Sequence, residues 1–321
     1  MDRQGPVAGV TRAVATFART YATDDDRWCV ALSGGADSLA LTAAAVAVKP
    51  TTALIVDHGL QFDSASVAAT AQQQALALGC VDAHILPVQV GTTGGPEAAA
   101  RTARYAALQS ARDGAPVLLG HTLDDQAETV LLGLGRGSGA RSIAGMRPYD
   151  PPWCRPLLGV RRSVTQAACG ELGVAPWQDP HNADRRFTRT RLRLDVMPLL
   201  EDVLGGGVAE ALARTATALR EDTDTLDEFA ELARSEVAVG EGLDTARLAA
   251  LPTAIRRRVI RGWLLAGGAC DLTDKQIRGV DALVTAWRGQ GGVAVGSPLR
   301  SQRLIAGRCD GTLTLHTEAV R

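Results

Sequence analysis

The feature that most constrains the fold is an apolar segment that enters a glycine-rich turn and then a helix-like stretch. Residues 29–32 read CVAL, residues 33–38 read SGGADS, and small apolar residues follow at helical spacing. Adjacent glycines let the backbone turn sharply after a strand, so that N–H groups of the turn and of the next helix point at one anion. We therefore predict that nucleotide phosphates bind at Ser33, Gly34, Gly35, Ala36, Asp37 and Ser38.

The acid in this turn adds a metal to the prediction. Asp37 beside anionic phosphates is favourable mainly when a divalent cation lies between them, so we expect Mg²⁺ with Asp37 as a ligand. The alternative is a plain strand-to-helix turn capped by Ser33 or Asp37. No Gly-Lys-Ser/Thr follows the glycines, which excludes a Walker A loop.

Short apolar segments alternate with alanine-rich helical stretches. The predicted strands span 28–32, 52–56, 84–90 and 116–120, and the predicted helices span 38–48, 64–78, 97–112 and 162–172. This alternation indicates a parallel sheet with right-handed crossovers, in which ligands bind at the carboxyl ends of the strands. The segments at those ends are 33–38, 57–59, 91–95 and 121–125.

Beyond residue 203 the pattern changes. Helical patterns cover 208–235, 244–266 and 273–288, and a glycine-punctuated, strand-like end follows. The triple glycine at 205–207 marks a boundary. We predict an α/β, Rossmann-like parallel-sheet domain over 1–203 and a mainly helical domain with a small strand-like end over 208–321.

Composition excludes several classes of protein. The formal net charge of −1 leaves no global electrostatic footprint for nucleic acid, so any such contact must be local. The six cysteines are scattered without a C-x-x-C pair, which argues against a zinc ribbon, an iron–sulfur cluster or a dithiol carrier. No stretch is apolar enough to span a bilayer and no signal peptide is evident, so we expect a cytoplasmic protein without a membrane partner.

Residues 121–129, HTLDDQAET, place polar groups at the next strand end. On a helix, His121, Asp125 and Glu128 share one face. Carboxylates with one histidine favour Mg²⁺ near phosphates over zinc, which makes Asp125 a second candidate metal ligand. The alternative for Asp125 is a capping box with Thr122.

Further candidate residues lie in three places. Asp57 and His58 end the second predicted strand, where their side chains either bond local backbone in a turn or border a site in which the nucleotide base meets the backbone of residues 54–56, Val56 included. Arg101 and Arg104 lie three apart on one predicted helix. Residues 155–193 hold eight arginines against three acids, a net charge of +5. Each group of arginines either binds phosphate or forms a solvated face.

The motifs also carry a family resemblance. SGGADS resembles the pyrophosphate loop of the N-type ATP pyrophosphatases (PP-loop superfamily), which leave an adenylate on their substrate. HTLDDQAET is similar to the second signature of tRNA(Ile)-lysidine synthetases, which convert the wobble cytidine of an isoleucine tRNA to lysidine. Other agreeing stretches are VDHGL at 56–60, EAAARTARYAAL at 97–108, LGLGRGSGARSIAGM at 132–146, RPLL at 155–158 and WQDPHN at 177–182.

The resemblance implies a PP-loop ATPase catalytic domain over 1–203 and a tRNA-binding domain over 208–321. The implied ligands are ATP, Mg²⁺, tRNA(Ile) with a CAU anticodon and free L-lysine, and a homodimer is left open. The implied reaction is adenylation of the C2 oxygen of the cytosine, followed by attack of the lysine ε-amine.

The resemblance also implies residue roles. Asp37, Arg104, Glu128 and Arg189 are expected to be catalytic, with Glu128 orienting or deprotonating the amine and the arginines offsetting negative charge. Val56, His58 and His121 join residues 33–38 in binding ATP. The expected metal ligands are Asp37 and Asp125, and the expected tRNA or substrate contacts are Arg101, Asp124 and Arg193.

Three rival functions stay open at this point. A sulfur-inserting tRNA enzyme of the same superfamily would need paired cysteines, which the chain lacks. A glutamine-dependent amide ligase would need an amidotransferase domain or an N-terminal nucleophilic cysteine, and neither is evident. A nucleotide-sensing module without catalysis would not need the carboxylates at 37, 125 and 128.

Overall fold

The computed structural model describes residues 5–21, 25–59, 63–91, 95–137, 139–299 and 301–319. Contacts divide the chain into two compact units, one made of Met1–Leu132 and Gly145–Arg214 and the other of Gly133–Ala144 and Thr215–Arg321. This division falls inside helix α10 (Val208–Val237). The domain boundary expected between residues 203 and 208 stays a prediction.

The first unit is built on a six-stranded sheet with the order β3-β2-β1-β4-β6-β5. The strands are β1 (Trp28–Ala31), β2 (Thr51–Asp57), β3 (Asp82–Pro87), β4 (Val117–Leu119), β5 (Tyr149–Asp150) and β6 (Trp153–Cys154). All neighbouring strands pair in parallel except β5, which is antiparallel to β6. The predicted α/β class is therefore confirmed, and β6 and β5 extend the sheet beyond the four strands that were predicted.

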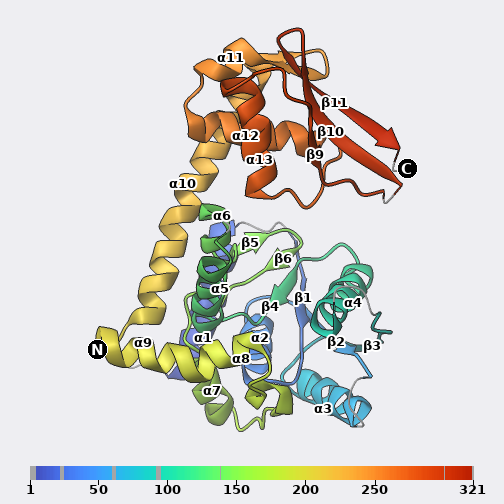
Figure 1. The fold of residues 1–321 in the computed structure, drawn as a ribbon. Coiled ribbons are helices and arrows are strands. Elements are labelled where there is room, and N and C mark those ends of the chain that lie inside the picture. Colours follow the sequence, from blue (N-terminus) through green and yellow to red (C-terminus); the bar gives the residue numbers. More distant parts are fainter. Residues whose placement is uncertain are drawn as a thin grey trace. The chain divides into compact units, whose positions relative to one another are not determined.

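Helices cover both faces of this sheet (Figure 1). Because strand side chains alternate, Val30 and Ile55 face one core while Cys29 and Leu54 face the other. The first core is shared with α1 (Pro6–Tyr21), α2 (Ala36–Val46), α3 (Ser64–Ala77) and α7 (Arg162–Glu171), and the second with α4 (Pro96–Ala111). Helix α1 lies outside the predicted elements and packs on α2 and α7.

The rest of the first unit consists of short helical segments around α5 (Leu123–Arg136). They are the 3₁₀ turn Pro180–Ala183, α8 (Thr188–Arg191), the π turn Leu192–Val196 and α9 (Met197–Leu204). Helix α9 ends at Gly205, whose φ of +82° is the left-handed conformation that favours glycine. The Glu201 carboxylate then accepts the N–H groups of Val208 and Ala209, which caps the start of α10.

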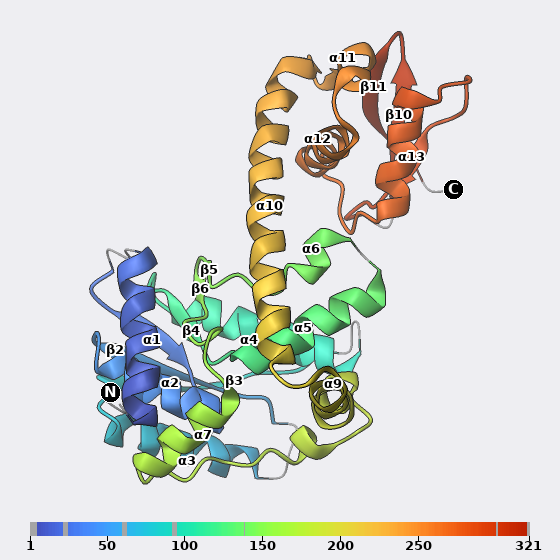
Figure 2. The ribbon, with the colours of Figure 1, turned by 90° about the vertical axis from the view of Figure 1, so that its left-hand side faces the viewer.

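The second unit contains most of α10 and a five-stranded antiparallel sheet with the order β7-β8-β11-β10-β9. Figure 2 shows α13 beside β10 of this sheet. Its elements are α6 (Ala140–Ile143), β7 (Ala238–Val239), β8 (Gly242–Asp244), α11 (Thr245–Ala250), α12 (Thr253–Ala266), α13 (Asp274–Thr285), β9 (Val293–Val295), β10 (Gln302–Cys309) and β11 (Thr312–Ala319). Leu243, Ile260 and Leu283 belong to its core. The expected helices with a strand-like end are confirmed, and the sheet also takes in β7 and β8.

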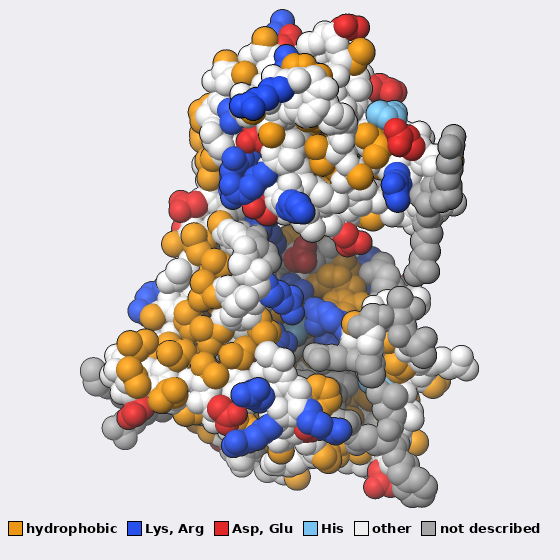
Figure 3. Space-filling view, in the orientation of Figure 1, with side chains coloured by type: hydrophobic (Ala, Val, Ile, Leu, Met, Phe, Trp, Pro, Cys, Tyr) orange, Lys and Arg blue, Asp and Glu red, His pale blue; other side chains and the backbone are white. Residues whose placement is uncertain are grey.

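Apolar side chains gather on the surface of the first unit over α9 (Figure 3). Leu199, Val203 and Leu204 are 60%, 68% and 65% exposed. Exposed apolar groups of this kind are frequent at contacts between proteins. Among the described residues, no helix is long and apolar enough to cross a membrane.

Candidate active site

The turn after β1 ends at an uncapped helix N-terminus. Gly34 has a φ of +80°, and Gly35 is the N-cap of α2 without a side-chain hydrogen bond to the helix. The N–H groups of a first helical turn have no acceptor inside the helix, and they favour an anion. The Ser38 hydroxyl accepts the N–H of Ser33 at 3.2 Å and contacts the carbonyl of Gly35 at 2.9 Å. This geometry suits the predicted phosphate site.

Two further residues fit closely around this turn: Gly120 leaves room for it, and Trp177 is hydrogen-bonded to it. A Cβ atom on Gly120, which directly follows β4, would lie 3.1 Å from the carbonyl carbon of Asp37 and from the nitrogen of Ser38. A side chain at Gly120 would therefore press on the first turn of α2. From the other side, the N–H of Trp177 donates to the carbonyl of Gly34 at 2.9 Å.

A cleft of about 480 Å³ opens beside the turn. Its volume lies within the range of about 300–1,000 Å³ that is typical of small-molecule sites. The predicted site residues that line it are Ser33, Gly35, Ala36, Asp37, Ser38, Val56, His58, Arg104, His121, Asp125 and Arg193. The cleft thus brings together residues from five separate parts of the sequence.

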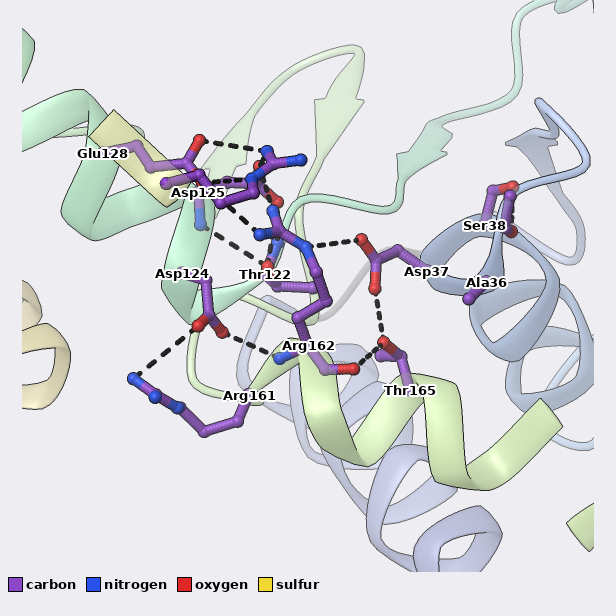
Figure 4. A network of polar contacts seen from close by, with 12 residues as sticks. Ala36, Asp37, Ser38, Thr122, Asp124, Asp125, Glu128, Arg161, Arg162 and Thr165 are labelled. Carbon is purple, nitrogen blue, oxygen red and sulfur yellow. Dashed lines mark hydrogen bonds and ion pairs between the residues drawn. The ribbon is translucent and has the colours of Figure 1, made fainter. Parts of the chain in front are cut away.

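Helix α7 supplies two partners of Asp37 that were not predicted (Figure 4). The Thr165 hydroxyl contacts Oδ1 of Asp37, and Nε of Arg162 lies 3.4 Å from Oδ2. Burial raises the pKa of Asp37, while Thr165 and Arg162 lower it without cancelling the effect of burial. The carboxylate therefore lies in a place where it benefits from more positive charge.

Asp125 is held on both of its oxygens. Oδ2 accepts the N–H and the hydroxyl of Thr122, and the Asp125 N–H points back to that hydroxyl at 3.4 Å, so the capping box is present. Oδ1 faces Arg162 at 2.7 Å and Arg193 at 3.5 Å, so capping is only part of its role. Burial favours a higher pKa for Asp125, but Arg162 and Thr122 outweigh it and hold the pKa below its usual range.

His121 lies just before the first residue of α5, and its imidazole is neutral. Burial, followed by the charges of Arg104, Arg155 and Arg189, lowers its pKa to about 3, although Asp125 opposes the shift. Nδ1 of His121 is buried without a hydrogen-bond partner among the described residues. A neutral imidazole with a free nitrogen can hydrogen-bond to a ligand that enters the cleft.

Glu128 is the most buried acid of this group, with a side chain that is 1% exposed. Its Oε1 accepts Nε of Arg193 at 2.8 Å and lies 3.3 Å from Nη1 of Arg162. Its Oε2 lies 3.4 Å from Nε of Arg189, whose Nη2 donates to the hydroxyl of Thr129. Three arginines therefore enclose the carboxylate that was expected to meet the lysine amine.

The arginine-rich stretch 185–193 divides into two groups. Arg189 and Arg193 point at Glu128, as described above. In contrast, Arg185 pairs with Asp195 and Arg186 pairs with Asp184, through side chains that are 66% and 86% exposed. The solvated face therefore describes Arg185 and Arg186, and phosphate binding by Arg189 and Arg193 stays a prediction.

The end of β2 forms the expected local turn and also borders the cleft. Oδ1 of Asp57 accepts the N–H of Gly59 at 3.0 Å, which forms a local turn. Val56, Asp57 and His58 nevertheless line the cleft, together with Arg104. Burial and the charge of Arg104 lower the pKa of His58. Of the expected site segment 91–95, residues 92–94 lie outside the described part of the chain.

Five predicted residues lie beside the cleft rather than in its lining. Gly34 contributes its conformation and its carbonyl, and Glu128 contacts both Arg189 and Arg193. The Asp124 carboxylate accepts the N–H of Arg162 at 2.8 Å and so caps α7. Arg101 is exposed and stacks on the ring of Tyr105 at 4.8 Å, outside the lining of the cleft.

The donor set suits a hard cation that is shared with a nucleotide. The described residues contain no group of three or more His, Cys, Asp or Glu side chains that could hold a metal alone. Mg²⁺ in nucleotide sites needs only one or two carboxylates, because phosphates and waters supply its other oxygens. Oxygens of Asp37 and Asp125 both face one guanidinium, that of Arg162, so they converge on one positive charge. The two acids therefore fit Mg²⁺ bound with phosphate.

Sequence reasoning missed Arg162, Thr165, Trp177 and Gly120. Helix 162–172 was expected, but none of its residues was given a role in the site. The signal that could have found it is the pair of arginines at its start, because cations at a helix N-terminus are unfavourable unless acids lie near them. Trp177 lies in the WQDPHN motif without a polar side chain to mark its role.

The comparisons with known proteins agree with this site. The family model of the PP-loop domain matches residues 9–200. The fold and the site therefore define an ATP-using protein of the PP-loop class, as the motifs predicted. A second family model, the TilS substrate binding domain, matches residues 243–305. The chain belongs to the tRNA(Ile)-lysidine synthase family.

Individual relatives support this membership. The tRNA(Ile)-lysidine synthase of Mycobacterium leprae is 72% identical over 324 residues, and the one of Mycobacterium tuberculosis is 73% identical over 324 residues. Both alignments cover 100% of this chain and 100% of the relative. The tRNA(Ile)-lysidine synthase of Rhodococcus erythropolis is 63% identical, with 91% of this chain and 90% of the relative covered.

A solved structure shows the same fold. The U34-tRNA thiolase NcsA from Methanococcus maripaludis, with its [4Fe-4S] cluster, superposes with a TM-score of 0.54 at 17% identity. The match covers 67% of this chain and 80% of that chain. At this identity the likeness concerns the fold alone.

Proposed function

We propose that this protein uses ATP to join free L-lysine to the wobble cytidine of tRNA(Ile) with a CAU anticodon. One observation carries the proposal: a phosphate-binding helix N-terminus and a carboxylate–arginine cluster share one cleft, in a chain that is 72% identical to a tRNA(Ile)-lysidine synthase. In the first step, the C2 oxygen of cytosine attacks the α-phosphorus of ATP and pyrophosphate leaves. In the second step, the lysine ε-amine forms a bond to C2, and AMP leaves with that oxygen.

ATP would lie along the cleft from the turn to the end of β2. The N–H groups of residues 34–38 would hold its phosphates, and Val56 and His58 would border its base. Nδ1 of His58 and Nδ1 of His121 are buried without hydrogen-bond partners among the described residues. Each nitrogen can therefore satisfy a polar atom of the nucleotide.

Asp37 and Asp125 would hold Mg²⁺ at this site. When bound, Mg²⁺ offsets the charge of the phosphate oxygens and makes the α-phosphorus more open to attack. Asp37 suits this role because it lies in the first turn of the helix that would bind the phosphates. Burial also raises its pKa, so a nearby cation would stabilise the charged carboxylate. Asp125 brings a second oxygen toward the same place.

The remaining catalytic roles belong to one acid and two arginines. Glu128 would orient the lysine amine and accept its proton, which requires that one of its arginine contacts opens. Arg104 lines the cleft, and its Nε is buried without a hydrogen-bond partner among the described residues. Arg104 and Arg189 would offset negative charge that develops in the two steps.

The tRNA would reach this cleft with its target base unstacked, which single-stranded anticodon loops allow at low cost. Arg101, Asp124 and Arg193 would lie toward the tRNA or the lysine substrate. The region that matches the TilS substrate binding domain would hold another part of the tRNA. A homodimer was left open, and the exposed apolar side chains on α9 would suit a contact between two copies of the chain. The cytoplasmic location stays a prediction from the sequence.

The chemistry of the cysteines argues against sulfur insertion, the alternative on the same fold. All six cysteines are free, and four of them are buried. Burial raises the pKa of Cys80 to about 11 and that of Cys154 to about 12, and it also raises the pKa of Cys29 and Cys169. Thiols of this kind resist conversion to the reactive thiolate.

Lysine transfer tests the proposal. The full chain is incubated with ATP, Mg²⁺, labelled lysine and either tRNA(Ile) with a CAU anticodon or the same tRNA with its wobble cytidine replaced by uridine. We expect label in the first tRNA only, with release of AMP and pyrophosphate. Absence of label in both tRNAs would refute the proposed function.

A further inference from the structure

Arg162 lies at the centre of the acidic group in the cleft (Figure 4). Its guanidinium faces three carboxylates, with Nε 3.4 Å from Asp37, Nη2 2.7 Å from Asp125 and Nη1 3.3 Å from Glu128. Its side chain is only 17% exposed. No other arginine in the described ion pairs of the first unit contacts three acids.

This position is unusual for an arginine of α7. Arg162 is the first residue of the helix, where the helix dipole disfavours a cation. The adjacent Arg161 points elsewhere, toward Asp124 at 3.7 Å and Glu210 at 3.6 Å, with a side chain that is 37% exposed. The carboxylates, rather than the helix, therefore determine where the guanidinium of Arg162 lies.

Two of its three partners are the acids that suit Mg²⁺. Without a cation between them, the negative charges of Asp37 and Asp125 would repel each other at close range. The pKa of Asp37 is raised by the burial of its carboxylate and also by the charge of Asp125. Arg162 supplies the positive charge that a bound divalent cation would otherwise bring.

We propose that Arg162 pairs with Asp37 and Asp125 where the divalent cation would bind, until the nucleotide arrives. The cation bound to the nucleotide then displaces Arg162 from these two carboxylates. Arg162 is thus a positioning residue, because it acts through the two acids. This inference rests on one part of the proposed function, namely that ATP and a divalent cation bind together in this cleft.

This arrangement has a consequence for the order of binding. A divalent cation that arrives alone meets two carboxylates that already share the guanidinium of Arg162, and this guanidinium repels the cation. A cation that arrives with ATP brings phosphate oxygens that the helix N-terminus binds at the same time. The protein should therefore bind the metal strongly only together with the nucleotide. After the exchange, Arg162 would still have Glu128 as a partner.

Mn²⁺, used in place of Mg²⁺, provides a direct test on the full chain without nucleotide. Electron paramagnetic resonance measures free Mn²⁺ during a titration of the wild-type protein, Arg162→Gln and the matched control Arg161→Gln. We expect Arg162→Gln to bind Mn²⁺ at least about tenfold more tightly than the wild type, because the two acids lose their counter-charge. Arg161→Gln should bind Mn²⁺ like the wild type, and adding Asp37→Asn to Arg162→Gln should abolish the gain.

Equal Mn²⁺ binding by Arg162→Gln and the wild type would overturn the inference. If Arg162→Gln does not fold, as judged by circular dichroism, the wild-type protein decides. It should bind Mn²⁺ at least about tenfold more tightly with a non-hydrolysable ATP analogue than without one, and tight binding without nucleotide would overturn the inference. These titrations need neither tRNA nor lysine, so they can fail while lysine transfer succeeds, or succeed while lysine transfer fails.

Discussion

Replacing Asp37 with asparagine should separate chemistry from folding. Asparagine has nearly the same shape, and its carbonyl oxygen can still accept the Thr165 hydroxyl, which contacts Oδ1 of Asp37 in the structure. The substitution removes one negative charge that lies 3.4 Å from Nε of Arg162. It leaves Arg162 with Asp125 and Glu128 as partners. The fold therefore keeps most of the contacts around this position.

Asp37→Asn should change the stability of the fold much less than the rate of adenylation. At an effective dielectric constant of about 20, a pair of charges separated by the 3.4 Å between Asp37 and Arg162 gains about 5 kcal/mol. The burial of the charged groups costs several kcal/mol, so the free energy of unfolding should change by less than about 1 kcal/mol. The loss of one group that stabilises transition-state charge should slow adenylation by at least about 100-fold, or about 2.7 kcal/mol.

The assay is single-turnover formation of adenylated tRNA from ATP labelled at the α-phosphate, with urea unfolding measured in parallel. Asp113→Asn is the matched control, because this carboxylate is 84% exposed, pairs with Arg27 and lies outside the cleft lining. The control should match the wild type in both measurements. Adenylation by Asp37→Asn within about threefold of wild type would refute the reasoning about charge at this position.

Three further predictions follow from the site. Glu128→Gln should slow lysine transfer more than adenylation, because its carboxylate serves the second step, and equal slowing of both steps in single-turnover assays would contradict that role. Gly120→Ala should weaken ATP binding and lower the free energy of unfolding by about 1–3 kcal/mol, since its Cβ would press on the backbone of Asp37; unchanged ATP affinity by calorimetry would exclude this contact. For His121, the unfolded side chain takes up a proton below pH about 6.5, while the folded one, with a pKa of about 3, stays neutral, so stability falls as pH falls. His121→Gln should remove up to about 2 kcal/mol of the stability lost between pH 7 and pH 5, and urea unfolding curves with the same pH dependence as the wild type would contradict this.

The order of strands and the position of the phosphate loop could be predicted because they depend on local patterns. The apolar segment before Ser33, the paired glycines and the helical spacing after Ser38 are read within about a dozen residues. The predicted strand 28–32 and helix 38–48 correspond to β1 and α2 with shifts of one or two residues. The carboxyl-end rule for parallel sheets then places distant loops at one edge.

The partners of the acidic residues could not be predicted in this way. Arg162 and Thr165 reach Asp37 from a helix more than a hundred residues further along the chain, and nothing in their own sequence shows which face of α7 meets the turn. The position of that face depends on the packing of α7 against α1 and α2 in the first core. The division of the arginine-rich stretch into partly buried and exposed members depends on tertiary packing in the same way, as Arg193 and Arg186 show.

The central claim is that this cleft adenylates a tRNA base before lysine reacts. Its most direct test omits lysine and measures pyrophosphate release and transfer of α-labelled AMP to tRNA(Ile) with a CAU anticodon. We expect a burst of pyrophosphate that matches the AMP bound to the tRNA, with neither product when the wobble cytidine is replaced by uridine. Pyrophosphate release that does not depend on that cytidine, or tRNA without bound AMP, would contradict the claim.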